Sequence, residues 1–587
     1  MASYSLAQMH TIPEMSGDPF VDKLLFIRGI KSKDEADVFL HPSYERDIRD
    51  PFGIFGLEKA ADRIVAAFKK GEKLAIYSDY DCDGIPGGVV LRDFLEAIGY
   101  TKYVVYIPHR IKEGYGMHIH AIDKLKEDGV TLIVTVDSGI TNIEEVAHAQ
   151  GLGIDVIVTD HHLPIHKEGD GQVVPLAYAV INSKQDVCTY HDDMLCGCAV
   201  AWKLSCGILS KLRVEKLGKK DSEIFSTVLE KVKALPIGWE KWLLDLVGIS
   251  TIADMVPLQK ENRALAHFGL TVLRKSSRPG LKKLFTLSST NQIFLTEDDI
   301  SFSIAPRVNA ASRMDDPRTA HEMLFEKDQT KGAGHAEFLE TLNALRKSEV
   351  KEAVADLSRY EHLFNNDVIV LGDESWTPGI IGLIAQNVID KTSKVVFVWG
   401  KGDHETLMKG SCRSLGDIHV VELMARAKEL FPDSLEHSGG HEQAGGFSIR
   451  KENIEKLSEA LNVAVKHVEK KQIDQEEVIV DGELSFDECT QRLYDKITRL
   501  APFGVGNAKP VFMFKKSIPT NIKWFGKKNE HLEISYQGDH NAIKAIQFFA
   551  NKNIEEKIKQ EHTLIASLEK SYFRGRGELR LRVVDVV

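Results

Sequence analysis

Long apolar runs are missing from this sequence of 587 residues. No stretch reaches the roughly 18–20 consecutive apolar residues that a transmembrane helix needs. The N-terminus, MASYSLAQMHTIPEM, also lacks the apolar core of a secretory signal peptide. A membrane protein is therefore not expected, and the expected location is cytoplasmic.

Paired cysteines are missing as well. The seven cysteines are scattered along the chain, and none of them forms a C-x-x-C pair. An odd, dispersed set indicates reduced thiols rather than a disulfide framework. The group between Cys188 and Cys206, with His191, could suggest a zinc site. Because LCGCAVAWKL has the composition of a closely packed helix, zinc is the less favoured interpretation.

Internal repeats and low-complexity tracts are also lacking, and the apolar content of 43% is that of an ordinary globular protein. A single core rarely grows past about 250–300 residues, so several domains are expected. The charge is uneven. Lys509–Val587 holds 15 Lys and Arg against 9 Asp and Glu, so this end carries +6 and the rest −17 of the total −11. Such a basic end is typical of a module that binds a polyanion, although a basic solvated surface explains it equally well.

Strand-like and helical patterns alternate through the first third of the chain. The runs KLAIYSD, YVVYIP, TLIVTVD and DVIVTDHH are rich in Val, Ile and Leu and are separated by helical segments. This alternation predicts a parallel sheet covered on both faces. A later apolar run, WLLDLVGISTIADMVPL, is interpreted as a further strand.

The second half of the chain divides into three parts. AEFLETLNALRKSEVKEAVADLSRY predicts a long helix that connects two lobes. A second α/β unit is predicted from DVIVLGDESW to SGGHEQAGGF. After it, short strands such as VFMFKK, HLEISY and LRLRVVDVV predict a small β-barrel.

The stretch YSDYDCDGI, Tyr77 to Ile85, contains the D-x-D-x-D-G pattern that begins a calcium-binding EF-hand loop. Two observations exclude that interpretation. The bidentate glutamate of such a loop would fall on Val90, and a strand rather than a helix precedes the aspartates. A strand, a carboxylate-rich turn and a helix instead form the beginning of a βαβ unit.

Polar side chains end several of the predicted strands, and the carboxyl ends of parallel strands meet at one edge of a sheet. These side chains are Asp79, Asp81, Asp83, Asp137, Asp160, His161 and His162. Oxygen-rich sites with one or two histidines suit Mn²⁺ or Mg²⁺ better than zinc. Two such ions about 3.5–4 Å apart can clamp a phosphoryl oxygen, and Asp137 is well placed to contact both. A helix N-cap explains a single aspartate but not D-x-D-x-D or D-H-H.

These motifs resemble a known family. SDYDCDG, TVDSG, TDHHLP and IADMVPL resemble the four motifs of the DHH phosphoesterases. IPHRIKEGYGM, PRVNAASR, KGSCRS, SGGHEQAGGF and APFGVGNAKPVF follow the order and approximate spacing of the RecJ exonucleases within that family. The resemblance extends from about residue 20 to the end. One departure is Tyr77, four residues before Asp81, where several relatives carry histidine.

The resemblance implies an α/β fold. It comprises a parallel-sheet DHH domain, a long helix to a second α/β lobe (DHHA1), and a C-terminal OB-like β-barrel. The expected boundaries are an N-terminal segment at 1–70, the DHH catalytic domain at 71–318, connecting helices at 319–365, the DHHA1 domain at 366–470 and the OB-fold at 471–587.

The resemblance also implies roles for residues at the strand ends. One cation would be held by Asp83, Asp137, His161 and Asp254, and the other by Asp81 and Asp137. Asp79 would be a further ligand or a partner of one. His162 would meet the scissile phosphate or its leaving group, and Asp160 would orient one of the histidines.

Further residues are implied to contact nucleic acid. The contacts to the nucleic-acid backbone would be Arg110, Arg307, Asn309 and Arg313. The phosphate site of the second lobe would be formed by Ser411, Arg413, Ser414, Gly439, Gly440 and His441. The contacts of the OB-like barrel would be Lys527, Lys528, Tyr572, Phe573, Arg574 and Arg576. Arginine's planar fork matches phosphate oxygens, and aromatic rings stack on unpaired bases.

The function implied is a 5′→3′ exonuclease for single-stranded DNA that uses two divalent cations, Mn²⁺ or Mg²⁺, releases 5′-mononucleotides and serves DNA repair and recombination. The expected partner is single-stranded DNA with a 5′ end, the expected state is a monomer, and a helicase and a single-strand-binding protein are further partners suggested by the family. Three alternatives stay open: a phosphodiesterase for short oligonucleotides or cyclic dinucleotides, an inorganic pyrophosphatase, and a non-catalytic replication scaffold.

Overall fold

The structure is a computed structural model that describes residues 4–6, 12–167, 171–404, 406–471, 478–526, 528–550, 554–572 and 577–587. Its first unit contains a sheet of five strands, in which every neighbouring pair is parallel. In spatial order the strands are β3 (Tyr103–Tyr106), β2 (Lys73–Ser78), β4 (Val130–Val136), β5 (Asp155–Thr159) and β8 (Ala179–Ile181). The parallel sheet predicted from the alternating pattern is therefore confirmed.

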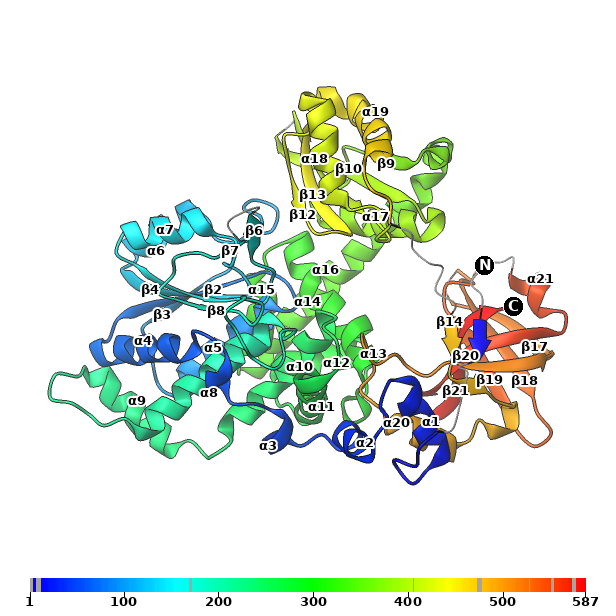
Figure 1. Cartoon of the computed structure of the whole chain (residues 1–587), viewed down its shortest axis with the longest axis horizontal. Helices are drawn as coiled ribbons and strands as arrows, with labels where there is room; N and C mark the ends of the chain where they lie inside the picture. Colours follow the sequence, from blue (N-terminus) through cyan, green and yellow to red (C-terminus); the bar gives the residue numbers. More distant parts are fainter. Residues whose placement is uncertain are drawn as a thin grey trace.

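Helices cover both faces of this sheet (Figure 1). On one face lie α4 (Leu57–Lys70), α5 (Gly84–Ala97) and α8 (Gly197–Val214), and on the other lie α6 (Ile119–Glu127) and α7 (Ile143–Gly151). Because both faces are buried, the strands need no polar alternation, which explains their continuous Val, Ile and Leu content. A short hairpin, β6 (Ile165–Lys167) and β7 (Gly171–Val173), stands apart from the sheet.

A helical layer follows the sheet in sequence and packs beneath it. Its helices are α9 (Glu223–Ala234), α10 (Leu244–Ala253), α11 (Lys260–Leu273), α12 (Pro279–Leu287), α13 (Glu297–Asp299), α14 (Ala305–Met314) and α15 (Arg318–Phe325), with a π-helical turn, η4 (Ile300–Ile304), before α14.

The strand expected in WLLDLVGISTIADMVPL is wrong, because this segment forms the α10 helix. A short continuous apolar run fits a buried strand and a buried helix equally well, so periodicity could not separate them. The contact between Gly248 and Gly269 lets α10 pack closely on α11. A Cβ on Gly248 would lie only 2.6 Å from the Gly269 Cα.

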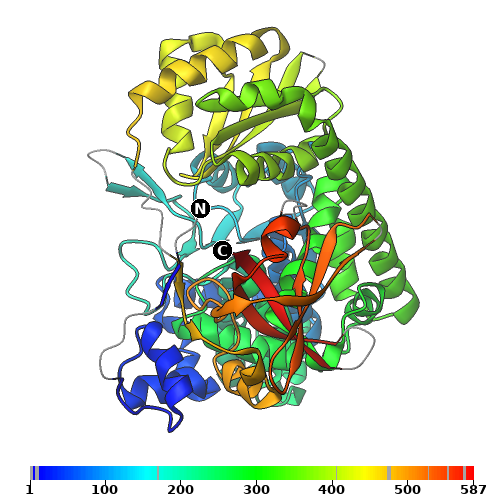
Figure 2. The same cartoon turned by 90° about the vertical axis from the view of Figure 1, so that its right-hand side faces the viewer.

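The predicted connecting helix is present as α16 (Gln329–Ala355), and it leads to the second lobe at the top of Figure 1. Figure 2 shows the same helix running up one side of the molecule. The sheet of the second lobe has the order β12 (His437–Gly440), β13 (Ala444–Arg450), β11 (Leu407–Arg413), β10 (Val395–His404) and β9 (Val368–Gly372). Its helices are α17 (Pro378–Thr392), α18 (Val420–Leu430) and α19 (Ile454–Ala464).

The C-terminal unit is a seven-stranded sheet that curls around its own core (Figure 2). Its strands, in spatial order, are β15 (Gly482–Glu483), β16 (Phe512–Ser517), β20 (His562–Ser571), β21 (Glu578–Val586), β19 (Ala542–Gln547), β18 (His531–Gln537) and β17 (Pro519–Phe525). Two helices, α20 (Gln491–Thr498) and α21 (Ile554–Ile558), accompany them.

The first 70 residues contact two different units. Helices α1 (Pro19–Ile27) and α2 (Lys33–Leu40) pack against the core of the C-terminal unit, and β1 (Tyr4–Leu6) pairs with β14 (Val478–Val480). After α3 (Tyr44–Asp47), however, α4 belongs to the core of the first unit. The N-terminal segment thus connects the C-terminal unit to the first unit. None of the helices that the structure describes is long and apolar enough to span a membrane.

Candidate functional site

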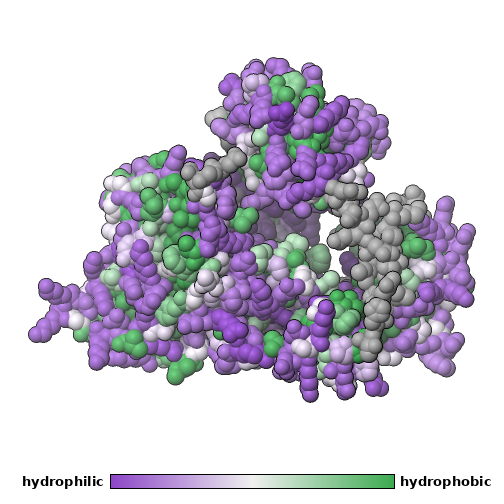
Figure 3. Space-filling view, viewed as in Figure 1, coloured by the Kyte–Doolittle hydropathy of each residue, from purple (hydrophilic) through white to green (hydrophobic). Residues whose placement is uncertain are grey.

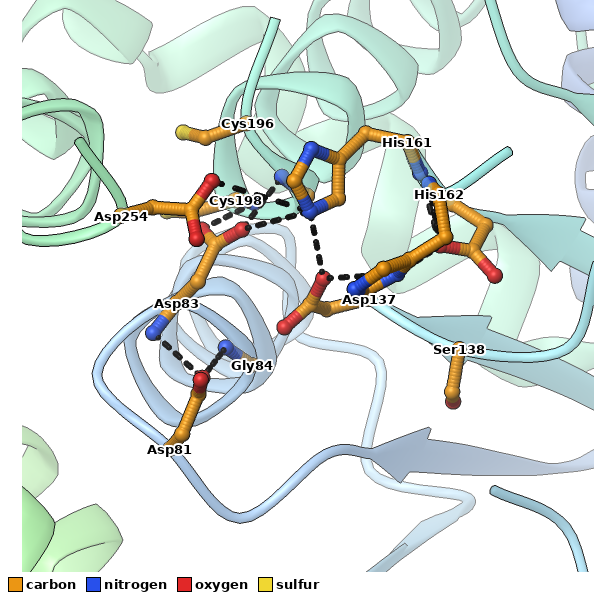
Figure 4. A network of polar contacts seen from close by, with 12 residues as sticks. Asp81, Asp83, Gly84, Asp137, Ser138, His161, His162, Cys196, Cys198 and Asp254 are labelled. Atoms are coloured by element: carbon orange, nitrogen blue, oxygen red, sulfur yellow. Dashed lines mark hydrogen bonds and ion pairs between the residues drawn. The ribbon is translucent and has the colours of Figure 1, made fainter. Parts of the chain in front are cut away.

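The carboxyl edge of the first sheet gathers the acidic and imidazole side chains that the sequence analysis selected. Asp79 follows β2, Asp137 follows β4, and the triplet Asp160–His162 follows β5. Two helices complete the group, because Asp83 stands at the N-terminus of α5 and Asp254 at the C-terminus of α10. Figure 4 shows Asp83, Asp137 and Asp254 pointing towards the ring of His161.

His161 is the centre of this arrangement. Its Nε2 lies 3.1 Å from Asp137 Oδ1, 3.6 Å from Asp83 Oδ2 and 3.7 Å from Asp254 Oδ2. His162 Nδ1 lies 3.8 Å from the same oxygen of Asp137. Three sets of side chains therefore place their ligand atoms within 4.8 Å of one another: Asp83, His161 and Asp254; Asp137, His161 and His162; Asp79, Asp81 and Asp137.

Backbone N–H groups hold the D-x-D-x-D-G turn in shape. Asp81 Oδ1 accepts hydrogen bonds from the N–H groups of Asp83 and Gly84, at 2.8 and 3.1 Å. Asp83 accepts from Gly197 and Cys198 at the N-terminus of α8, at 2.6 and 2.9 Å, where the helix dipole favours a negative charge.

Small residues are required where the backbone comes close to this turn and to Asp137. A Cβ on Gly84 would lie 2.7 Å from Asp79, and a Cβ on Gly197 would lie 2.6 Å from the Asp137 Cβ. Asp137 itself has a φ of +60°, a left-handed conformation that is uncommon outside glycine and concentrates at functional sites. The backbone therefore directs the Asp137 carboxylate into the centre of the cluster.

The carboxylates of this edge repel one another, and the nearby charges of Arg110, His162 and Lys184 offset this repulsion only in part. Burial and the neighbouring Asp81 raise the pKa of Asp83 to about 6, and burial with Asp83 and Asp81 raises the pKa of Asp254 to about 8. The pKa values of Asp79 and Asp137 are raised by the same two causes. Within the described part of the chain, Asp79 Oδ1 and Asp137 Oδ1 are buried without a hydrogen-bond partner. Buried carboxylate oxygens without hydrogen-bond partners, beside imidazole rings, are suitable ligands for divalent cations.

The two histidines have opposite charge preferences. Burial, together with the neighbouring His162, lowers the pKa of His161 to about 3, so its imidazole is neutral and can act as a ligand. Burial also disfavours charge on His162, but the 2.9 Å hydrogen bond from its Nδ1 to Asp160 raises its pKa to about 9. Asp160 also accepts the N–H groups of Ile140, His161 and His162. It therefore shapes this strand end as well as orienting His162.

A cationic group lies next to the acidic one, where α14 meets the second lobe. Arg313 is partly buried and donates to Gly379 O on α17 at 3.2 Å. Burial and the charges of Arg110, Arg346 and Arg413 lower its pKa to about 9. The structure describes no carboxylate paired with Arg110, Arg313 or Arg413 among the residues it covers. Figure 3 shows that the surface is hollowed between the second lobe and the unit below it.

The second lobe brings side chains close to both groups. Arg413 donates to Ser411 Oγ at 3.0 Å, and α17 passes so closely that a Cβ on Gly382 would lie 3.2 Å from the Arg413 guanidinium. The ring of His441 lies 6.3 Å from that of His162 and nearly parallel to it.

Glycine is needed in the strand that leads to His441. Gly440 has a φ of +145°, and a Cβ there would lie 2.4 Å from Ala444 O. Ser438, Gly439 and Gly440 of the SGGH segment thus lie in β12 and pair with β13, and His441 follows the strand. Ser414 is buried and accepts the N–H groups of Gly416 and Ile418, so its hydroxyl shapes a turn.

Two residues of the PRVNAASR motif, Arg307 and Asn309, have protein partners, and their contact with nucleic acid stays a prediction. Arg307 is buried and forms an ion pair with Glu340 at 2.5 Å. Asn309 Oδ1 accepts the N–H of Cys82 at 2.9 Å, while Ser250 Oγ on α10 donates to the Cys82 carbonyl at 3.2 Å. The backbone N–H and C=O of Cys82, the residue between Asp81 and Asp83, therefore both have hydrogen-bond partners. Tyr77 is also a core residue, donating its hydroxyl to Gly116 O.

The predicted contacts of the C-terminal unit are described only in part. Lys527, Phe573, Arg574 and Arg576 lie outside the described residues. The ring of Tyr572 stacks on Phe294 of the first unit, with centroids 4.2 Å apart and planes 3° apart. Lys528 lies close to Lys351 of α16, and the proximity of the two ammonium groups lowers the pKa of Lys351.

Comparisons with known proteins cover most of the chain. Residues 73–229 match the DHH family, N-terminal domain; residues 365–467 match the DHHA1 domain; residues 480–585 match the RecJ OB domain. The single-stranded-DNA-specific exonuclease RecJ of Escherichia coli is 30% identical over 505 residues, covering 84% of this chain and 83% of the relative. The chain belongs to the RecJ family.

Two further members show how far the likeness extends. RecJ of Bacillus subtilis is 31% identical over 537 residues, and the alignment covers 90% of this chain but 63% of that relative. The crystal structure of RecJ from Thermus thermophilus in complex with Mn²⁺ has a TM-score of 0.76 and 24% identity, covering 97% of this chain and 76% of the other. The predicted fold class, with DHH, DHHA1 and OB units, is confirmed.

Several residues beside the RecJ-family motifs escaped the sequence analysis. The Tyr115 hydroxyl donates to Asp137 O at 3.1 Å and lies 3.1 Å from His162 Nδ1. The signal that could have found it is its location in the IKEGYGM motif. Arg346 on α16 had no such signal, because the helix looked like a simple connector. Its Nε is buried without a partner among the described residues. Ser250 lay in the segment interpreted as a strand.

Proposed function

We propose that this RecJ-family chain is a metal-dependent exonuclease that degrades single-stranded DNA from its 5′ end and releases 5′-mononucleotides, in DNA repair and recombination. The observation that carries the proposal is the position of Asp137. It belongs to two of the three ligand sets, so one carboxylate can join two cation sites. The RecJ relatives named above are single-stranded-DNA-specific exonucleases, and the T. thermophilus protein was solved with Mn²⁺.

In this proposal Asp83, Asp137, His161 and Asp254 hold one Mn²⁺ or Mg²⁺, and Asp79, Asp81 and Asp137 hold the other. The unsatisfied oxygens of Asp79 and Asp137 and the neutral ring of His161 support this assignment. When bound, such a pair of cations activates water and neutralises the charge that develops on the phosphoryl oxygens.

His162 binds the reacting phosphate in this proposal. Its Nδ1 is directed at Asp160, at 2.9 Å, so the other ring nitrogen, Nε2, is available to substrate. A protonated imidazole donates a charge-assisted hydrogen bond to a phosphate oxygen or to the leaving oxygen. Asp160 is the positioning residue that holds this ring.

The 5′ polarity is assigned to the cationic group at the hollow. Arg110, Arg313 and Arg413, with Ser411 and His441, form a site for a terminal phosphate, and Arg346 extends it along α16. Support comes from burial and the neighbouring arginines, which together lower the pKa values of Arg313 and Arg413 and whose effect an anion would relieve. A strand end held there would present its first phosphodiester to the acidic edge. Gly439 and Gly440 let the backbone of β12 lie close to the substrate.

Single-stranded DNA is the proposed partner, and the basic C-terminal unit supplies affinity away from the site. Lys528 and Tyr572 stay candidate contacts there. A helicase and a single-strand-binding protein as further partners, a monomeric state, a cytoplasmic location and the expected domain boundaries also stay predictions. Because the chain spans 63% of the B. subtilis relative, the activity of that whole protein is transferred only as part of this proposal.

The test is digestion of single-stranded DNA labelled at either end, with Mn²⁺, Mg²⁺ or chelator, by the wild type and by Asp137→Ala. We expect early release of the 5′ label as mononucleotide, which requires metal and is abolished by the substitution. Cleavage of two- to five-nucleotide oligomers with the long strand left intact would favour the short-substrate phosphodiesterase. No cleavage of either under any metal would favour the scaffold.

A further inference from the structure

A buried ion cluster lies at the far ends of the two helices that carry Asp83 and Asp254. Arg278, at the N-terminus of α12, is its centre and is 8% exposed. Its Nη1 donates to Asp93 Oδ2 at 2.6 Å, and its Nε donates to Asp245 Oδ2 at 2.8 Å. A second bond from Nη2 reaches the other oxygen of Asp245 at 3.3 Å.

The two carboxylates belong to helices that end at the candidate metal centre. Asp93 lies on α5, which begins directly after Asp83, and Asp245 lies on α10, which ends directly before Asp254. Asp93 is ten residues from Asp83 and Asp245 is nine from Asp254, so at 1.5 Å per residue the cluster is on the order of 15 Å from the centre. One guanidinium thus joins two rigid elements that each deliver one carboxylate.

The two delivered carboxylates differ in how firmly they are held locally. Asp83 is fixed by the N–H groups of Gly197 and Cys198. For Asp254, the structure describes no side-chain hydrogen bond within the residues it covers, only the approach to His161 Nε2 at 3.7 Å. The location of the Asp254 carboxylate therefore depends on the placement of α10.

The hydrogen bonds of the cluster fix this placement of α10. Arg278 also donates to Leu324 O at 3.0 Å, Ser276 Oγ donates to Asp245 at 2.8 Å, and Lys327 Nζ donates to Asp93 at 2.6 Å. Each carboxylate oxygen of Asp93 and Asp245 thus accepts a hydrogen bond from a side chain at or next to α12 or α15. A hydrophobic contact could slide along α10, whereas a bidentate guanidinium fixes the helix in one register.

We propose that Arg278 is a positioning residue that sets the separation of Asp83 and Asp254, and through it the affinity of the cation site that these two form with His161. α10 carries none of Asp79, Asp81 and Asp137, and it meets their turn through the hydrogen bond from Ser250 Oγ to the Cys82 carbonyl. Loss of the cluster therefore weakens the cation site that contains Asp254 more than the other. This inference rests on the proposed metal-dependent function.

Asp245→Asn is the first variant, because asparagine keeps the shape of the side chain but turns one acceptor for Arg278 into a donor. Arg278→Lys is the second, since lysine keeps the charge but cannot bridge two carboxylates with a planar fork. Glu72→Gln is the matched control. Glu72 and Asp155 flank Arg63 in a similar bridge, at 2.7 and 2.6 Å, but at the opposite edge of the sheet.

The readout is Mn²⁺ binding to the full chain, followed by the electron paramagnetic resonance signal of free Mn²⁺, with thermal unfolding measured alongside. In Asp245→Asn and Arg278→Lys, one class of Mn²⁺ sites should weaken by about tenfold, as for other residues that orient metal ligands, and the second class should stay within about twofold. Glu72→Gln should lower the melting temperature with both classes unchanged.

Three results would overturn the inference in distinguishable ways. If either variant folds with a lowered melting temperature and retains both Mn²⁺ affinities, Arg278 serves stability alone. Equal weakening of both classes would mean that the whole edge, not α10, is displaced. If the wild type binds no Mn²⁺ at all, the proposed function fails together with the role of Arg278.

Discussion

Two neighbouring groups in this molecule have opposite charge imbalances. The sheet edge concentrates Asp79, Asp83, Asp137 and Asp254 with raised pKa values, and the lobe junction concentrates arginines with lowered ones. Both conditions are costly for a folded protein, because like charges are held together in a buried place. We propose that cations complete the acidic group and that an anion completes the basic group. Their adjacency fits a substrate whose phosphate lies between metal ions and arginines.

The acidic group should give the largest effect when it is broken. Asp137→Asn removes the carboxylate shared by two ligand sets, and we expect exonuclease activity on single-stranded DNA to fall by roughly 10³–10⁵-fold, as for removal of a central catalytic group. In chelator the variant should melt at or above the wild-type temperature, since one like charge is gone. A variant that stays active would show that Asp137 does not join the cation sites.

Removal of a cation from the basic group should have a smaller, end-specific effect. Arg313→Gln or Arg413→Gln should lower kcat/KM by about ten- to hundredfold on 5′-phosphorylated strands, since a hydrogen bond to a charged group contributes about 1.5–3 kcal/mol. The loss should be much smaller on 5′-hydroxyl strands.

Arg450→Gln is the control for this experiment, because Arg450 lies on the same lobe but is exposed and paired with Glu436 at 2.5 Å. Equal losses on both kinds of 5′ end would remove these arginines from the terminal-phosphate site.

The pH dependence of stability should distinguish the acidic group with and without metal. The folded pKa values of Asp83 and Asp254, about 6 and about 8, lie above the ordinary value of 3.8. Their contribution to stability is therefore fully present below about pH 4 and is lost as the pH rises through 6 to 8.

In chelator, the melting temperature should fall by on the order of 5 °C between pH 5 and 8. With Mn²⁺ present this fall should disappear, because cations bind the ionised carboxylates. Thermal unfolding at four pH values in both buffers tests this, and a flat profile in chelator would contradict the account.

The smallest effect is expected from the exposed cations of the C-terminal unit. Lys528→Ala should weaken single-strand binding about threefold and reduce the slope of log K against log salt by about 0.7–1, as for one phosphate contact. The control is Lys559→Ala, because Lys559 is already ion-paired with Glu555 at 2.9 Å. An unchanged salt slope in Lys528→Ala would place the strand elsewhere on this unit.

The acidic group could be predicted from the sequence, and the surroundings that hold it could not. Asp79, Asp137 and His161 each end an apolar strand, so the pattern of a parallel sheet alone brings them to one edge. Asp254 came from the family resemblance, although the preceding helix was misread as a strand. The partners of the motifs come from distant segments, as with Asn309 at the Cys82 peptide and Arg278 between Asp93 and Asp245.

The basic group was predicted less completely for a physical reason. An arginine in a motif can face a ligand or a carboxylate, and only tertiary packing decides between them. Arg313 lies near Arg110 and Arg413, whereas Arg307, six residues earlier, pairs with Glu340. Arg346 joined the group because α16 runs beside α14, and a connecting helix carries no local signal of that neighbour. The packing of the N-terminal segment on the C-terminal unit is equally non-local.

The central claim is that Asp137 joins two cation sites at the edge of the first sheet. The most direct measurement is anomalous diffraction at the manganese edge from crystals of the chain grown with Mn²⁺. We expect two peaks about 3.5–4 Å apart, as in other two-metal sites, with an Asp137 carboxylate oxygen bound to each. A single peak, or two peaks of which one does not contact Asp137, would contradict it.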